Sequence, residues 1–412
     1  MHNKYLDHFI QQFIHYIIPK EKKALILDKN RKNISNLSEK YDYIVLVNLL
    51  EKEHDILSLL EKIYQHLSEN GRLVIIYRNY LHSFFIGLLK SFFKQEYTDY
   101  NWLATSDIKT FLKLTNFELF IHEPLCFTEA SIPLLSKILN RFILHIFPID
   151  HLSFLQYIIA IKKPHSLKSA TVSIVIPARN ERGTIEKLFH SLPTLGPRCE
   201  IIFIEDHSTD NTLLEMKRCL QLFPNKKNRS FRLLILKKDA GKAAGVRLGF
   251  DNAKGDIIII YDADMTIPAA DLLKFYTALI TRKGDFINGS RLVYPVGKGA
   301  MQLLNILGNK FFTILYSWLL GQQVKDTLCG TKAFWRKDYL EIKRNVDFLK
   351  SQDPFGDFYL LLGASRLNLK IIDLPVRYCE RTYGSTNIKR FKHAWQLFKL
   401  SLFSIKKFKM RI

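Results

Sequence analysis

The sequence predicts an α/β protein of two domains. The chain has 412 residues, and a single hydrophobic core rarely extends beyond about 250–300 residues. Short apolar runs alternate with helical patterns along most of the chain, which is the order of elements in α/β folds. The alternation stops once, at a polar stretch, and then restarts. Hydrophobic residues make up 47% of the chain, enough to supply a core on each side of that stretch.

The first domain is expected at residues 1–163. Four apolar runs in it predict β-strands, and the segments between them have helical patterns. After the last run, the segment KKPHSLKSA at 162–170 contains a proline and has no hydrophobic period, so we expect a linker at residues 164–170. The predicted strands are KALIL (23–27), YIVLV (43–47), RLVII (72–76) and FLQYIIAI (154–161).

The second domain is expected at residues 171–385, where the alternation restarts. Four strongly apolar runs are each followed by a plausible helix, which is the pattern of parallel strands buried on both faces. Loops beyond the carboxyl ends of such strands are free to carry ligand-binding residues. The runs are TVSIVIP (171–177), EIIFIED (200–206), FRLLILKK (231–238) and DIIIIYDAD (256–264), and the polar residues near their ends are Asn180, Glu181, Asp206, Asp262 and Asp264.

Asp262 and Asp264 directly follow the most apolar of these strands. Two carboxylates separated by one residue in a turn can converge on one hard cation. We expect Mg²⁺ or Mn²⁺, because such ions keep water and diphosphate oxygens in their remaining positions. The alternative is that both are ordinary loop or helix-capping acids before Pro268.

The chain is strongly basic, with a formal net charge of +22. This charge indicates an anionic partner: nucleic acid, an acidic membrane surface or a phosphorylated substrate. No RNA- or DNA-binding motif accompanies the charge, so we expect no nucleic-acid partner. The five cysteines are scattered without CxxC or Cys/His spacing, which argues against a disulfide framework or a zinc site and fits a reducing compartment.

Six motifs follow one another in the second domain: IVIPARNE (174–181), IEDHSTDNT (204–212), AGKAAGVRLGF (240–250), YDADMT (261–266), NGSR (288–291) and DTLCGTKAF (326–334). In this order, and near this spacing, they resemble the family-two glycosyltransferases with the GT-A fold, over residues 171 to about 392. Within that family the chain is most similar to the polyprenyl-phosphate sugar synthases, such as dolichyl-phosphate mannose and glucose synthases. The resemblance implies a mixed, mainly parallel sheet and a nucleotide-diphosphate sugar as donor.

The resemblance also implies roles for single residues. Each has an ordinary alternative: residues 208–210 could cap the next helix, Gly241 and Gly245 could permit tight turns, and Asp357 could position the acceptor or cap a helix. The residues that match nucleotide-binding positions are Pro177, Ala178, Asn180, Glu181, Asp206, Lys242, Asp262 and Ala263, and the metal-binding pair is Asp262 and Asp264. The candidates for catalysis are Asp357, Asp326 and Arg381, and those for the acceptor phosphate are Arg291 and Lys332.

We therefore expect an inverting, metal-dependent transfer of a sugar to a polyprenyl phosphate, such as undecaprenyl or dolichyl phosphate. A phosphate acceptor is already largely dianionic at neutral pH, so it needs no base. A hydroxyl acceptor in polysaccharide or glycan synthesis is the alternative, and it would require Asp357 or Asp326 as the base. A non-catalytic membrane-binding protein is a third reading, against which the intact aspartates argue.

A basic amphipathic helix is expected at residues 386–412. After Glu380 the chain has nine Lys or Arg residues and no acidic residue. Such a helix lies in the interface of an anionic membrane, although it could instead pack on its own domain. The chain ends without the transmembrane helices that many relatives of this type carry, and we expect a peripheral protein on the cytoplasmic face of the membrane. The residues that recur on one helical face are Phe391, Trp395, Phe398, Leu402 and Ile405.

Residues 20 to 163 resemble the second half of a class I methyltransferase, most clearly at 41–80. Binding of S-adenosylmethionine in that fold depends on a glycine-rich turn after the first strand. In this chain the segment after Asp28 is KNRKNISNL, and the first glycine is Gly71. We therefore expect a truncated, inactive methyltransferase-like domain.

Overall fold

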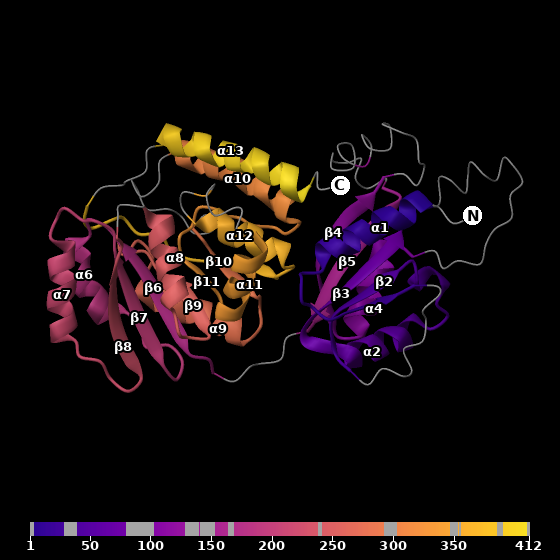
Figure 1. Ribbon diagram of the computed structural model, residues 1–412, viewed down its shortest axis with the longest axis horizontal. Coiled ribbons are helices and arrows are strands. Elements are labelled where there is room, and N and C mark those ends of the chain that lie inside the picture. The colour runs from indigo at the N-terminus through magenta and orange to yellow at the C-terminus, as the bar shows by residue number, and fades with distance from the viewer. Residues whose placement is uncertain are drawn as a thin grey trace, which may run out of the picture. The chain divides into compact units, whose positions relative to one another are not determined.

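The computed structural model describes residues 4–28, 39–79, 103–127, 140, 153–163, 169–237, 241–291, 303–346, 353, 356–384 and 390–409 (Figure 1). The chain forms two compact units, residues 1–163 with 405–412, and residues 164–404. Most of the predicted linker, 164–168, lies outside the described residues, as does the segment 29–37 that follows Asp28.

The first unit contains a five-stranded sheet formed by β1 (Ala24–Leu27), β2 (Tyr41–Val47), β3 (Leu67–Arg78), β4 (Phe117–Cys126) and β5 (Leu155–Lys162). The order is β1-β2-β3-β5-β4, with β1 to β3 parallel and β5 antiparallel to both of its neighbours. All four predicted strands are confirmed, as β1, β2, β3 and β5. β4 was not predicted, because its polar residues and Pro124 interrupt the apolar run. The helical elements are α1 (Lys4–Ile17), η1 (Leu50–Lys52), α2 (Ile56–His66) and α4 (Thr105–Leu114).

Both faces of this sheet are buried. Ile44 and Leu46 of β2 pack in one core with α2 and α4, whereas Tyr43 and Val45 pack in a second core with α1. Because successive side chains of a strand point to opposite faces, a strand covered on both sides must be apolar throughout. The methyltransferase resemblance of this unit stays a prediction.

The second unit contains a seven-stranded sheet formed by β6 (Val172–Ala178), β7 (Cys199–Glu205), β8 (Arg229–Ile235), β9 (Ile257–Ile260), β10 (Phe286–Ser290), β11 (Lys332–Trp335) and β12 (Ile371–Pro375). The order is β12-β10-β11-β9-β6-β7-β8, and only β11 runs antiparallel to its neighbours. The predicted α/β class with a mixed, mainly parallel sheet is therefore confirmed, and so are the four predicted strands, as β6, β7, β8 and β9.

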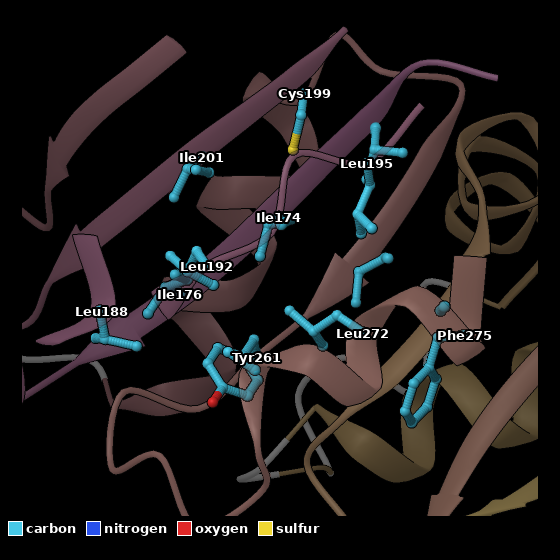
Figure 2. Close-up of a cluster of buried hydrophobic side chains, with 14 of the residues drawn as sticks. Ile174, Ile176, Leu188, Leu192, Leu195, Cys199, Ile201, Tyr261, Leu272 and Phe275 are labelled. Atoms are coloured by element: carbon cyan, nitrogen blue, oxygen red, sulfur yellow. The ribbon is translucent and has the colours of Figure 1, made fainter. Parts of the chain in front are cut away.

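The helical elements of the second unit are α6 (Arg182–Ser191), α7 (Thr212–Leu222), α8 (Lys242–Asn252), η4 (Ala269–Asp271), α9 (Leu272–Ile280), α10 (Leu303–Leu320), α11 (Arg336–Val346), α12 (Asp357–Arg366) and residues 390–404 of α13 (Arg390–Phe408). Ile174 and Ile176 of β6 pack in one core with residues of α6 and α9 (Figure 2). On the opposite face, Gly249 of α8 lies so close to Val175 that a Cβ would come within 2.4 Å of it. Helices thus cover β6 on both faces, and β6, β7 and β9 end at the same edge.

Helix α13 lies beside α10, and Ser401 Oγ donates a hydrogen bond to Tyr316 OH over 3.3 Å (Figure 1). The helix packs through Leu397, Leu400 and Ser401, while Trp395, Phe398 and Leu402 of the predicted apolar face are 58%, 40% and 52% exposed. The side chain of Phe391 lies outside the described residues. Within the described part of the chain, none of the helices combines the length and the apolar character that crossing a bilayer requires.

Candidate functional site

Hydrogen bonds join the loops that follow β6 and β7. Asn180 has a positive φ of 57°, its backbone NH donates to Ser208 Oγ over 3.1 Å, and its side-chain oxygen accepts from the NH of Thr209 over 2.7 Å. The NH of Glu181 donates to the Thr212 hydroxyl over 2.9 Å. The segment 208–212 therefore braces the loop that contains Asn180 and Glu181.

The other residues predicted to hold the nucleotide lie at the same edge. Pro177 and Ala178 pair with Ile204 and Glu205 in the parallel ladder, so their side chains are fixed by the sheet. Asp206, just beyond β7, is 3.7 Å from Arg179. Ala263 is buried in the core, so only its backbone can contact a ligand at this edge.

Asp262 forms a close ion pair with Lys242. The Lys242 ammonium is 2.6 Å from Asp262 Oδ1, and each side chain is about one third exposed, at 33% and 31%. Partial burial opposes ionisation, but Lys242 outweighs it and holds the pKa of the Asp262 carboxyl below its usual value. Backbone also approaches this carboxylate: a Cβ on Gly330 would lie 2.1 Å from Asp262 Oδ2 and 2.7 Å from the Lys242 nitrogen.

Asp264 is held by two groups. Its Oδ1 accepts hydrogen bonds from the NH and hydroxyl of Thr266, over 3.1 and 2.9 Å, and its Oδ2 is 3.0 Å from the Arg381 guanidinium. Arg381 also lies 3.1 Å from Glu181 Oε1. One guanidinium therefore joins the loop after β9 to the start of α6, although 117 residues separate Arg381 from Asp264.

Glu181 is a buried carboxyl with 6% side-chain exposure, and its second oxygen, Oε2, has no hydrogen-bond partner among the residues that the structure describes. Burial raises the pKa of Glu181 to about 7, against the attraction of Arg381 and with added repulsion from Asp264, Asp210 and Asp262. Near neutral pH this carboxyl is therefore poised between its neutral and ionised forms.

This shift predicts a pH-dependent stability. The folded protein binds the Glu181 proton more tightly than the unfolded chain, so the free energy of unfolding should fall as the pH rises from about 4.5 to about 7, by roughly 3 kcal/mol. The variant Glu181→Gln should lack this pH-dependent part of the free energy of unfolding. Urea unfolding at pH 5 and pH 8 measures the difference, and identical losses of stability in wild type and variant would contradict the assignment.

Lys332 and Asp357 form a second pair, 3.2 Å apart. Asp357 is the first residue of α12, and the Lys332 side chain is fully buried and also donates to the carbonyl of Cys329. A phosphate cannot reach Lys332 in this arrangement. The predicted role of Lys332 at the acceptor phosphate therefore stays a prediction that would require the pair to open.

Arg291 and Asp326 form a third pair with two parallel contacts. Arg291 Nε donates to Asp326 Oδ2 over 2.7 Å and its NH2 donates to Oδ1 over 2.9 Å. The backbone NH groups of Arg291 and Leu328 donate to the same carboxylate, which is completely buried. A base must have a free lone pair, so Asp326 could act as one only after this network opens.

Sequence reasoning missed the residues that make these contacts possible. Gly330 lies within the motif DTLCGTKAF, which was the available signal for it, but its role depends on Asp262 lying against it. Tyr383 donates to Asp210 over 3.1 Å, and its ring fills the space where Gly183 would carry a Cβ. No local pattern marks Tyr383, because its partners lie about 170–200 residues earlier in the chain.

The residues around Asp262 and Asp264 fit a hard divalent cation. Both offer carboxylate oxygens, and the missing Cβ of Gly330 leaves room for the Asp262 carboxylate. Within the described residues, no group of three or more His, Cys, Asp or Glu side chains could hold a metal by itself. A metal at this pair would therefore need ligands from a substrate or from water.

Comparisons with known proteins agree with these motifs. A family model described as glycosyl transferase family 2 matches residues 173–343. The dolichyl-phosphate beta-glucosyltransferase of Saccharomyces cerevisiae is 30% identical over 230 residues, which cover 51% of this chain and 67% of the yeast protein. The dolichol-phosphate mannosyltransferase of Pyrococcus furiosus is 32% identical over 234 residues, 53% of this chain and 59% of that protein. The chain thus matches 67% of the length of the yeast protein and 59% of the length of the Pyrococcus protein.

Among solved structures, the mannosyltransferase PcManGT of Pyrobaculum calidifontis, in complex with GDP-Man and Mn²⁺, is 19% identical. It aligns over 60% of this chain and 66% of its own, with a TM-score of 0.40. The sequence matches confirm the family predicted from the six motifs and support a glycosyltransferase. The chain belongs to glycosyl transferase family 2 and is a glycosyltransferase.

Proposed function

We propose that this glycosyltransferase moves a sugar from a nucleotide-diphosphate sugar to a polyprenyl phosphate, with inversion and with a divalent metal. One observation supports this best: Asp262 and Asp264 lie at the carboxyl edge of the parallel strands, beside Lys242 and Arg381. Carboxylates for a cation and cations for a diphosphate are thus present in one place. The similarity to dolichyl-phosphate sugar transferases favours a lipid phosphate as acceptor.

Asp262 and Asp264 would hold Mg²⁺ or Mn²⁺ together with diphosphate oxygens of the donor. When bound, the cation neutralises the charge that builds up on the departing diphosphate. The braced loop at Asn180 and Glu181, with Asp206 beyond β7, would hold the nucleoside. Arg381 contacts both this loop and Asp264, and it would donate to the diphosphate of the donor.

Both candidate bases are engaged in ion pairs, which favours a phosphate acceptor. Asp357 pairs with Lys332, and Asp326 is engaged by Arg291 through both oxygens. A hydroxyl acceptor needs an available carboxylate, whereas a phosphate monoester attacks without one. We therefore assign Asp357 a positioning role at the start of α12.

The variant Asp357→Asn tests this assignment. Turnover should fall by less than about 100-fold, because removing a true general base costs about 10²–10⁴-fold. The dependence of the rate on pH should keep its acidic limb in the variant, since no proton acceptor has been lost. A larger loss together with a vanished acidic limb would instead identify Asp357 as the base of a hydroxyl acceptor. A thermal melt of Asp357→Asn checks that the variant is still folded, because the substitution leaves the buried ammonium of Lys332 without its carboxylate partner.

We further propose that the enzyme works at an anionic membrane on its cytoplasmic face. The exposed side chains of Trp395, Phe398 and Leu402 lie on α13, together with Lys399, whose ammonium is 5.4 Å from the centre of the Trp395 ring. Exposed Phe311 and Ile314 lie on the neighbouring α10. Apolar side chains with basic neighbours are typical of helices that lie in a membrane interface.

A direct assay tests the proposed function. The full chain is incubated with Mg²⁺ or Mn²⁺, a panel of nucleotide sugars, and undecaprenyl or dolichyl phosphate, and the products are analysed by mass spectrometry. We expect a glycosyl phospholipid for one donor and no product with a chelator. Nucleotide release without lipid glycosylation would contradict the lipid acceptor, and full turnover with chelator would contradict the metal.

A further inference from the structure

Asp262 and Asp264, which we call the DxD pair, each have a cationic partner from a distant part of the chain. Lys242 is the first residue of α8 and lies 2.6 Å from Asp262, and Arg381 follows β12 and lies 3.0 Å from Asp264. A metal held by Asp262 and Asp264 would need these carboxylates. A metal and these two side chains therefore compete for the same carboxylates.

The pair at Asp262 differs from the buried pairs of the same unit. Arg291 and Asp326 share two contacts and are 14% and 0% exposed. Lys242 and Asp262 share one contact and are about one third exposed. An ammonium on a flexible stem with access to water separates from its partner at much lower cost than a bidentate, buried guanidinium. The Lys242 pair is therefore exchanged more readily than the Arg291 pair.

Charge balance indicates when the exchange occurs. The two aspartates and their two cations are neutral together. A divalent cation arriving alone would add its full charge beside Lys242 and Arg381, which repels it. A nucleotide-diphosphate sugar carries one negative charge on each phosphate, so metal and donor arriving together add no net charge. The diphosphate also offers new partners to the displaced ammonium and guanidinium.

We propose that Lys242 and Arg381 occupy the DxD carboxylates as substitute cations in the free enzyme and transfer to the donor diphosphate when metal and donor bind together. This inference rests on the metal site of the proposed function. It makes Lys242 a gate for the metal: the ion binds weakly alone and tightly with the nucleotide. The gate ties metal loading to the presence of a donor.

Binding of Mn²⁺ to the full chain tests the gate without any turnover. The free ion is measured by electron paramagnetic resonance, first alone and then with UDP or GDP as the nucleoside diphosphate. In wild type, the nucleotide that binds should raise the Mn²⁺ affinity at least about tenfold, the scale of one charged hydrogen bond. In Lys242→Met, the affinity without nucleotide should rise about tenfold, because the competitor is gone.

Two variants make the comparison specific. Lys242→Arg keeps the charge and should bind Mn²⁺ alone as weakly as wild type. Lys343→Met removes a lysine from a similar exposed pair, 2.7 Å from Asp251, and should leave Mn²⁺ binding unchanged. Melting temperatures confirm that the variants are folded.

The outcomes separate the two proposals. Equal Mn²⁺ affinities for Lys242→Met and wild type without nucleotide would overturn the gate while leaving the metal site intact. Tight Mn²⁺ binding to the wild type without nucleotide would also overturn the gate and leave the metal site intact. No binding to wild type with either nucleotide, or binding that survives Asp262→Asn, would overturn the metal site and with it the proposed function.

Discussion

Replacing either DxD aspartate, as Asp262→Asn or Asp264→Asn, should lower turnover by at least about 100-fold, the typical cost of removing one preorganised electrostatic group. An amide keeps the shape of the side chain but lacks the charge that would hold a divalent cation against the departing diphosphate. Initial rates of glycolipid formation at saturating Mn²⁺ and donor measure the effect. A loss of only a few fold would contradict the metal role of the pair.

A control for these variants is available in the same unit. Asp251 lies 2.7 Å from Lys343 and is 40% exposed, a carboxylate in an ion pair like that of Asp262. Asp251→Asn should change turnover little. The ion pair of Asp251 with Lys343 lies on the protein surface, where such a pair contributes on the order of 1 kcal/mol or less to the free energy of unfolding. A large loss of turnover in Asp251→Asn would mean that the effect of the DxD variants is not specific.

The variant Gly330→Ala should also lose turnover by about 100-fold, although it changes no charged group. Its Cβ would lie 2.1 Å from Asp262 Oδ2 and 2.7 Å from the Lys242 nitrogen, well inside van der Waals contact. The Asp262 carboxylate must move, and a displacement of about 1 Å in a catalytic group can cost about 100-fold in rate. Mn²⁺ affinity in the presence of nucleotide should fall in parallel.

Gly245→Ala provides the matched comparison for this glycine. Gly245 lies in α8, where an added Cβ would meet Ile204, Leu236 and Pro177 at ordinary distances of 3.5 to 3.9 Å. Turnover should stay near that of wild type, and the free energy of unfolding should rise by roughly 0.5–1 kcal/mol, because alanine is favoured over glycine inside a helix. Equal turnover in Gly330→Ala and Gly245→Ala would show that Asp262 does not depend on the space at Gly330.

The strands β6, β7 and β9, buried along most of their length, were predicted, whereas β10 and β11, which are also buried, and β12 were not. The runs around Ile202 and Ile258 are apolar without interruption, because each strand has helices or other side chains on either side. β4 was missed because Glu118, His122 and Pro124 interrupt its apolar pattern, and its place beside β5 depends on long-range pairing. A long uninterrupted apolar run marks a buried strand in the local sequence, whereas strand pairing, or a short buried strand with polar residues such as β10, leaves no such mark.

In the candidate site, too, some features could be predicted from the local sequence and others could not. The motifs placed Asp262, Asp264 and Glu181 at the ends of strands or just beyond them, since those positions follow from the order of strands and loops. The partners of these residues could not be predicted. Lys332 and Arg291 carry charges suited to a phosphate, yet the fold engages them with Asp357 and Asp326, which lie 25 and 35 residues away in sequence.

By itself, the sequence determined the α/β class, the strongly apolar strands and the acidic residues at one sheet edge, because these depend on hydrophobic pattern and on short spacings. Only the tertiary structure decided which cation lies against which carboxylate: Lys242 on Asp262, Arg381 across Asp264 and Glu181, and the open space at Gly330. Such pairings depend on distances of a few ångströms between residues that are up to 200 positions apart, and no local pattern records them.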